Sequence, residues 1–117
     1  MDLPKQVGGD DVGPTPVELL LASLAGCIGA VARRHEKRLG APLEGLEIEV
    51  EGYYDPRGFE GEDVKPGIQK VKVIVTLRTP VDDEKLREFM RFVEDHCPVE
   101  DTIKNITEVE IELKKVS

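Results

Sequence analysis

The stretch PTPVELLLASLAGCIGAVARRH, residues 14–35, decides the fold because it predicts a long helix that is apolar on every side. Thr15 followed three residues later by Glu18 is typical of a capping box, which starts a helix. Beyond the cap, the only polar residue before the basic end is Ser23, and the segment stops at Gly40. A helix without a polar face has to be surrounded by other structure.

The rest of the chain predicts an α+β fold in which this helix packs on a small antiparallel sheet. Apolar and polar residues alternate over residues 46–51 and 71–77, which predicts two strands, and the turn-rich segment 55–67 connects them. Asp82 caps a second helix with one apolar stripe. Alternation over residues 109–114 predicts a third strand.

Three strands and a second helix cannot cover a helix that is apolar all round, so we expect a second copy of the chain to complete the cover. Ala22, Gly26 and Ala30 recur at every fourth residue and form a ridge of small side chains. Another helix can approach such a ridge closely. The sequence therefore predicts a homodimer.

Size and charge limit the classes of function. A chain of 117 residues has room for one domain, residues 1–117. Its net charge of -8 disfavours nucleic acid and anionic membrane surfaces as partners. The apolar helix is short for a membrane span and runs directly into arginines. The N-terminus lacks the pattern of a secretory signal, so we expect a cytoplasmic protein.

The two cysteines, Cys27 and Cys97, are the strongest candidates for chemistry. Cys27 lies inside the first helix and Cys97 continues the apolar stripe of the second, so both thiols are expected to face one core. A reactive thiol needs a nearby cation or hydrogen-bond donors, and Arg34, two turns beyond Cys27, is the candidate cation. The residues alone do not decide which thiol attacks. Two buried, inert cysteines are the alternative.

Other chemistries have less support in the sequence. His35 is expected to be exposed at a basic helix end, and His96 lacks a spaced partner for zinc, so no metal site is predicted. No phosphate loop, nucleophile elbow or dinucleotide fingerprint is present, and we expect no cofactor. Glu18 is explained by the capping box rather than by catalysis.

The segments GPTPVELLLASLAGC and HCPVEDTIKN, with the order of elements between them, resemble the OsmC and organic hydroperoxide resistance (Ohr) family. The resemblance implies an intertwined homodimer in which Cys27 attacks a peroxide and Cys97 resolves the product. It also implies a dithiol reductant of the lipoyl-linked kind. Val17 stands at the position of the family's catalytic glutamate, no arginine precedes Cys27, and the family's N-terminal strands are expected to be shortened or missing. These differences favour the OsmC-like branch.

The prediction is accordingly an OsmC-like thiol peroxidase that reduces organic hydroperoxides by a two-cysteine mechanism in antioxidant defence. Leu24 and Ile28 are expected to line an apolar substrate pocket beside Cys27, with Arg34 in support. The alternative is a non-catalytic dimeric scaffold or small-ligand binding module with structural cysteines. A sulfur carrier using Cys97 is disfavoured because a helix, not a strand, is predicted before it.

Overall fold

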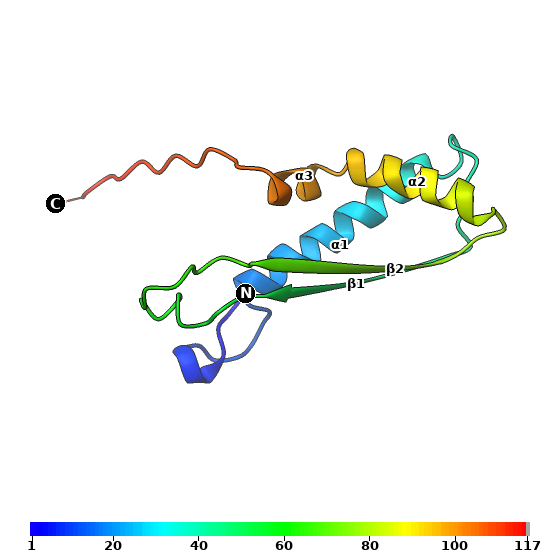
Figure 1. Cartoon of the computed structure of the whole chain (residues 1–117). Coiled ribbons are helices and arrows are strands. Elements are labelled where there is room, and N and C mark those ends of the chain that lie inside the picture. The colour runs from blue at the N-terminus through cyan, green and yellow to red at the C-terminus, as the bar shows by residue number, and fades with distance from the viewer. Residues whose placement is uncertain (117) are drawn as a thin grey trace.

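The elements of the chain are arranged around one long helix, as the computed structural model of residues 1–116 shows (Figure 1). In chain order they are η1 Lys5–Val7, α1 Pro16–His35, β1 Gly45–Tyr53, β2 Lys70–Arg78, α2 Asp83–Asp95 and α3 Pro98–Lys104. The long α1 lies between the strand pair on one side and the two shorter helices on the other. This is the α+β arrangement expected from the sequence.

The start and end of α1 follow the predicted signals. Thr15 Oγ1 accepts a hydrogen bond from the Glu18 N–H at 3.1 Å, and the Thr15 N–H donates to Glu18 Oε1 at 2.9 Å. The capping box is therefore complete, and the pKa of Glu18 is lowered chiefly by the hydrogen bond from the Thr15 backbone. After α1, the chain turns at Gly40, whose φ of 67° is a left-handed conformation that favours glycine.

The two predicted strands form an antiparallel pair in which Ile48 lies opposite Val75. Half-buried residues alternate with exposed ones along β1, and its half-buried side chains pack against the core of α1. The contact is close, because a Cβ at Gly29 of α1 would lie 3.6 Å from Ile48 Cδ1. The pleat thus puts the glutamates of β1 on the outer face.

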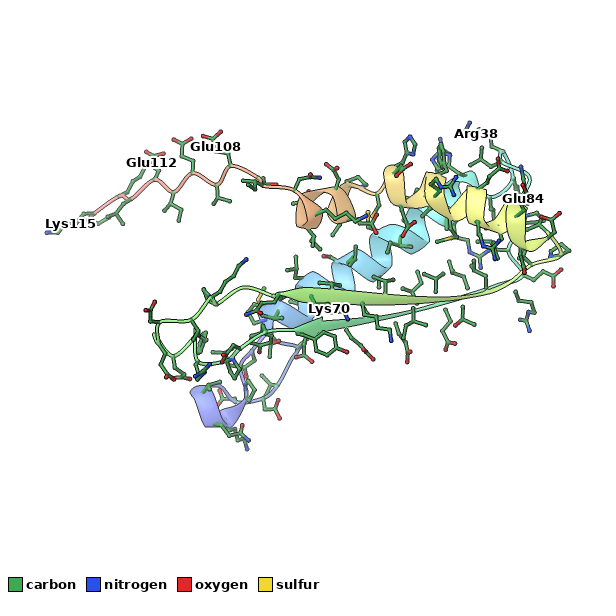
Figure 2. All side chains as sticks on the ribbon, viewed as in Figure 1. Arg38, Lys70, Glu84, Glu108, Glu112 and Lys115 are labelled. Carbon is green, nitrogen blue, oxygen red and sulfur yellow. The ribbon has the colours of Figure 1, made fainter. Side chains whose placement is uncertain are left out.

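The predicted third strand is wrong for the single chain. After Asn105, the described residues 106–116 form an extended arm that pairs with no other part of residues 1–116. Figure 2 shows Glu108, Glu112 and Lys115 along this arm, away from the helices and the strand pair. The apolar residue Ile111 is 86% exposed. Alternation alone cannot make a strand, because a strand also needs a free sheet edge within reach.

The core lies along one face of α1, so α1 is not buried on every side as its composition suggested. Its buried members are Leu24, Ile28, Ala32, Ala41, Leu43, Phe89, Val93 and Cys97. The predicted ridge of Ala22, Gly26 and Ala30 is exposed. A Cβ at Gly26 would meet nothing within 4 Å. The chain therefore leaves an apolar face of α1 uncovered.

By length and composition, α1 is also apolar enough to cross a membrane. Its packing opposes that arrangement, because α1 lies directly against β1. If α1 crossed a bilayer, the open edges of this two-stranded sheet would enter the hydrocarbon core. Each unpaired backbone group there costs on the order of several kcal/mol. Cover of the apolar face of α1 by protein fits these contacts better than a bilayer does.

Candidate active site

The first thiol, Cys27, is positioned by the buried face of α1. Leu24 and Ile28 lie on that face and are almost fully buried, and Cys27 packs against the same cluster while remaining half-buried. Its thiol therefore sits at the border between the core and the uncovered face of the helix.

The second thiol, Cys97, is held between α2 and α3. His96 closes α2 through a hydrogen bond from its N–H to the Val93 carbonyl, and Cys97 is the extended residue that precedes Pro98 at the start of α3. Proline is favoured at that position because it has no N–H to leave unpaired. Cys97 is only 1% exposed, so the apolar stripe of α2 continues through it into the core.

The fold brings the two thiols into contact. Both are free, and the Cys97 thiol interacts with the thiol of Cys27. Burial raises the pKa of the Cys97 thiol, and the Cys27 thiol raises it further. The backbone N–H groups of Glu100 and, more weakly, of Val99 lower it, but the net change is an increase. The prediction that both thiols face one core is confirmed, whereas their roles in a reaction stay predictions.

The other predicted site residues divide into two groups. Leu24 lines a cavity of about 260 Å³ between α1, β2 and α3, while Ile28 is 2% exposed in the packed core and is not among the residues that line this cavity. Arg34 is exposed two turns beyond Cys27, roughly 10 Å along the helix axis. Its support of the thiol remains a prediction.

The prediction that His35 is exposed is wrong, because its ring meets Phe92 edge-on at 5.0 Å and is half-buried. His96 stacks on the Phe92 ring at 4.0 Å. Loss of solvent, followed by the charges of Arg38 and Arg34, lowers the pKa of His35. Aromatic packing therefore accounts for both histidines, and residues 1–116 contain no group of three His, Cys, Asp or Glu able to hold a metal.

Sequence reasoning missed the burial of Glu100. Glu100 is only 8% exposed, and its backbone N–H helps to lower the pKa of the Cys97 thiol. Glu100 is the third residue after Cys97, so both lie on one side of the short helix, but this spacing does not indicate that Glu100 is buried.

Comparison with known proteins identifies the family of this chain. The model of the OsmC-like protein family matches residues 8–112, which is most of the chain. The chain belongs to the OsmC-like protein family. A hydroperoxide reductase of Mycoplasma genitalium is 26% identical over 101 residues, covering 86% of this chain and 70% of that protein.

Solved structures of OsmC-like proteins share the fold. The OsmC-like protein of Mycoplasma pneumoniae superposes with a TM-score of 0.75 at 23% identity, over 89% of this chain and 70% of that one. An OsmC-like hydroperoxide resistance protein of Jannaschia sp. CCS1 gives a TM-score of 0.73 at 21% identity, over 90% and 69% of the two chains. The expected resemblance is therefore confirmed for family and fold.

Proposed function

We propose that this OsmC-like protein is a thiol peroxidase that reduces organic hydroperoxides with Cys27 and Cys97. The observation that carries the proposal is the contact between these two free thiols, which come from distant parts of the chain. The name of the Mycoplasma genitalium relative, a hydroperoxide reductase, supports the same chemistry. A reducing compartment such as the cytoplasm would keep both thiols available.

The difference in burial supports Cys27 as the attacking thiol and Cys97 as the resolving thiol. Cys27 is half-buried and open to a peroxide, whereas Cys97 is 1% exposed. In the first step the Cys27 thiolate attacks the terminal peroxide oxygen, the O–O bond breaks, and the leaving alkoxide takes a proton to become an alcohol. Cys27 is then a sulfenic acid. Cys97 attacks this sulfur and releases water, giving a Cys27–Cys97 disulfide.

The reductant has to return two electrons and two protons to this disulfide. A dithiol does so by exchange through a mixed disulfide and closes its own ring as it leaves. We include a dithiol of the lipoyl-linked kind in the proposal as the external reductant.

Organic hydroperoxides are the substrate class that suits the surroundings of Cys27. Leu24, one turn of α1 before Cys27, lines a cavity of about 260 Å³ with Val71 and Val73 of β2, and neither thiol is among the residues that line it. An organic group that buries apolar surface there gains about 25 cal/mol per Å² relative to water. Hydrogen peroxide has no such group, so we expect larger alkyl and aryl hydroperoxides to react faster.

We further propose that the functional unit is an intertwined homodimer. The exposed ridge of Ala22, Gly26 and Ala30 offers a close approach to a second α1. The arm formed by residues 106–116 supplies alternating apolar and charged side chains that lack a sheet edge within residues 1–116. A second copy would cover the ridge and provide an edge for the arm.

A dimeric scaffold or small-ligand binding module with structural cysteines is the second candidate. One observation favours it: burial raises the pKa of Cys97, which slows nucleophilic chemistry at that thiol. In such a protein, both cysteines would only fill space in the core.

Dithiol-dependent consumption of cumene hydroperoxide separates the two functions. We expect wild-type turnover, a return to the buffer rate in Cys27→Ser, and in Cys97→Ser one equivalent of peroxide consumed before the reaction stalls at oxidised Cys27. Wild-type turnover in Cys27→Ser would overturn the assigned role of Cys27. Absence of turnover in all three proteins would favour the scaffold.

A further inference from the structure

A cluster of rings joins the end of α1 to the end of α2, next to the resolving thiol in the sequence. Phe92 of α2 meets the His35 ring edge-on, with centroids 5.0 Å apart, and stacks on the His96 ring at 4.0 Å. The guanidinium carbon of Arg38 lies over the same Phe92 ring at 5.5 Å. We name these four side chains the Phe92 cluster, and the steps of the proposed reaction leave all of them without a role.

The cluster is connected to Cys97 through the end of α2. Nδ1 of His96 lies 2.7 Å from the Phe92 carbonyl, and this nitrogen donates the hydrogen bond because a carbonyl only accepts. Cys97 is the next residue, and its thiol contacts Cys27 on α1. The end of α2 is therefore fixed to α1 at two places, the Phe92–His35 contact and the contact between the two thiols.

The hydrogen bond from Arg38 requires a neutral His35 ring. Arg38 Nη2 lies 3.1 Å from Nδ1 of His35, and a guanidinium nitrogen only donates hydrogen bonds. Nδ1 of His35 is therefore the unprotonated, accepting nitrogen, and a proton added there would remove the bond. His96 differs, because its Nδ1 already donates to a carbonyl and would continue to do so in the charged ring.

The charges around His35 also oppose its protonation. Loss of solvent lowers the pKa of this ring most, followed by the charges of Arg38 and Arg34 and then by His96. The carboxylate of Glu36, the next residue, is paired with an arginine of α1 at 2.8 Å. On the α2 side, the cavity beside the cluster is lined by two basic and two acidic side chains, Lys85, Arg91, Glu88 and Asp95. These four balance, which leaves the two arginines next to His35 as uncompensated charges.

Resting on the proposed peroxidase function, we infer that Phe92 is a positioning residue for Cys97 in the resolving step and that the Phe92 cluster loosens when His35 takes up a proton. With a neutral His35, the cluster holds the end of α2 on α1 and keeps the Cys97 sulfur against Cys27. A charged His35 loses the hydrogen bond from Arg38 and is repelled by that guanidinium. The end of α2 then separates from α1, and Cys97 meets the sulfenic acid less often.

The direction of the pH effect follows from the lowered pKa of His35. A cation on an aromatic ring is itself favourable, but the lowered pKa means that desolvation and repulsion outweigh this gain. The unfolded chain binds the proton more readily, since its histidines titrate at about 6.5. The stability that depends on neutral His35 is therefore fully present above about pH 6.5, and is lost as the pH falls toward the lower pKa of the folded state.

Single-turnover oxidation at neutral pH tests the positioning role. Each protein is mixed with one equivalent of cumene hydroperoxide, dimedone traps sulfenic acid, and an alkylating agent caps thiols. Mass spectrometry then follows the Cys27 sulfenic acid and the disulfide separately. In Phe92→Leu we expect unchanged formation of the sulfenic acid but disulfide formation about three- to tenfold slower, because the aromatic contacts are lost.

Two further variants control for the change of side chain. Phe92→Tyr keeps the ring and should form the disulfide at the wild-type rate. Phe59→Leu makes the same substitution as the test variant at an exposed phenylalanine in the connection between β1 and β2, and should alter neither step. A disulfide rate in Phe92→Leu equal to that of wild type would overturn the positioning role.

The pH profile separates positioning by the cluster from a general loss of stability. His35→Asn offers an amide oxygen to Arg38 but cannot be protonated. The ratio of the wild-type disulfide rate to the His35→Asn rate cancels the titration of the thiols, which both proteins share. We expect this ratio to be constant from about pH 8 to about pH 7 and to fall about three- to tenfold by about pH 5. In a Phe92→Leu background it should stay constant, and a constant ratio in the wild-type background would overturn the pH sensitivity.

Nuclear magnetic resonance of the reduced wild type tests the connection without any variant. The ring protons of His35 and the backbone amide of Cys97 should shift together, with one midpoint below the ordinary histidine pKa. A Cys97 amide that does not follow His35 would overturn the connection between the cluster and the thiol. Absence of Cys27 sulfenic acid in wild type would overturn the peroxidase function and with it the role of Phe92, whereas this titration reports on the cluster alone.

Discussion

The two faces of α1 differ in what covers them. One face carries Leu24 and Ile28 into a closed core with Cys97, and Cys27 lies at its border. The opposite face carries Leu19 and the ridge of Ala22, Gly26 and Ala30, a ridge that nothing in residues 1–116 covers. Both faces lack charged residues between Leu19 and Ala32. Burial in a single chain therefore depends on which partners the connections bring to each face, and not on hydrophobicity alone.

The largest expected effect comes from the closed face. Ile28 is 2% exposed, so Ile28→Ala should cost about 2–5 kcal/mol of unfolding free energy through lost burial and the cavity left behind. Leu19→Ala is the matched control on the open face, where Leu19 is 36% exposed. Urea unfolding at several protein concentrations measures both costs.

We expect the cost of Ile28→Ala to be the same at all protein concentrations. The cost of Leu19→Ala should be within about 0.5 kcal/mol under conditions that keep the protein monomeric, and should increase where the protein associates. Equal, concentration-independent costs for both variants would show that the two faces are not different in the way described.

A smaller effect is expected from the open face itself. A Leu side chain at Gly26 has space in the single chain, where a Cβ meets nothing within 4 Å, but would separate two helices that cross there. Overpacking costs about 1–3 kcal/mol, so Gly26→Leu should weaken dimerisation by about tenfold to a hundredfold. Light scattering across a dilution series measures the change.

Gly67→Leu is the control for this substitution, because Gly67 is also open but lies in the connection between β1 and β2. We expect Gly67→Leu to dimerise like wild type. A wild-type protein that is monomeric at every concentration would contradict the dimer, and unchanged dimerisation of Gly26→Leu would place the ridge outside the interface.

Local signals in the sequence predicted the helical part of the fold well. Thr15, Glu18 and Pro98 act through neighbouring backbone groups, so their roles could be inferred without knowledge of the tertiary structure. The convergence of Cys27 and Cys97 was also predictable, because each falls on an apolar stripe and a small domain has one core.

Two features could not be predicted because they depend on distant partners. The alternation at Val109, Ile111 and Leu113 indicates a strand but not which sheet edge receives it, and no edge does so within residues 1–116. The burial of Glu100 depends on how α3 packs on α1 and β2. In the sequence, Glu100 is indistinguishable from the exposed Asp101 beside it.

Disulfide formation is the most direct test of the central claim that Cys27 and Cys97 form a redox pair. The folded protein is treated with one equivalent of cumene hydroperoxide, remaining thiols are alkylated, and the intact mass and the peptides are measured. We predict the loss of two hydrogen atoms and a peptide pair joined through Cys27 and Cys97, with both thiols protected from alkylation. Two alkylated thiols, with an intact mass increased by both alkyl groups and no Cys27–Cys97 peptide pair, would contradict the account.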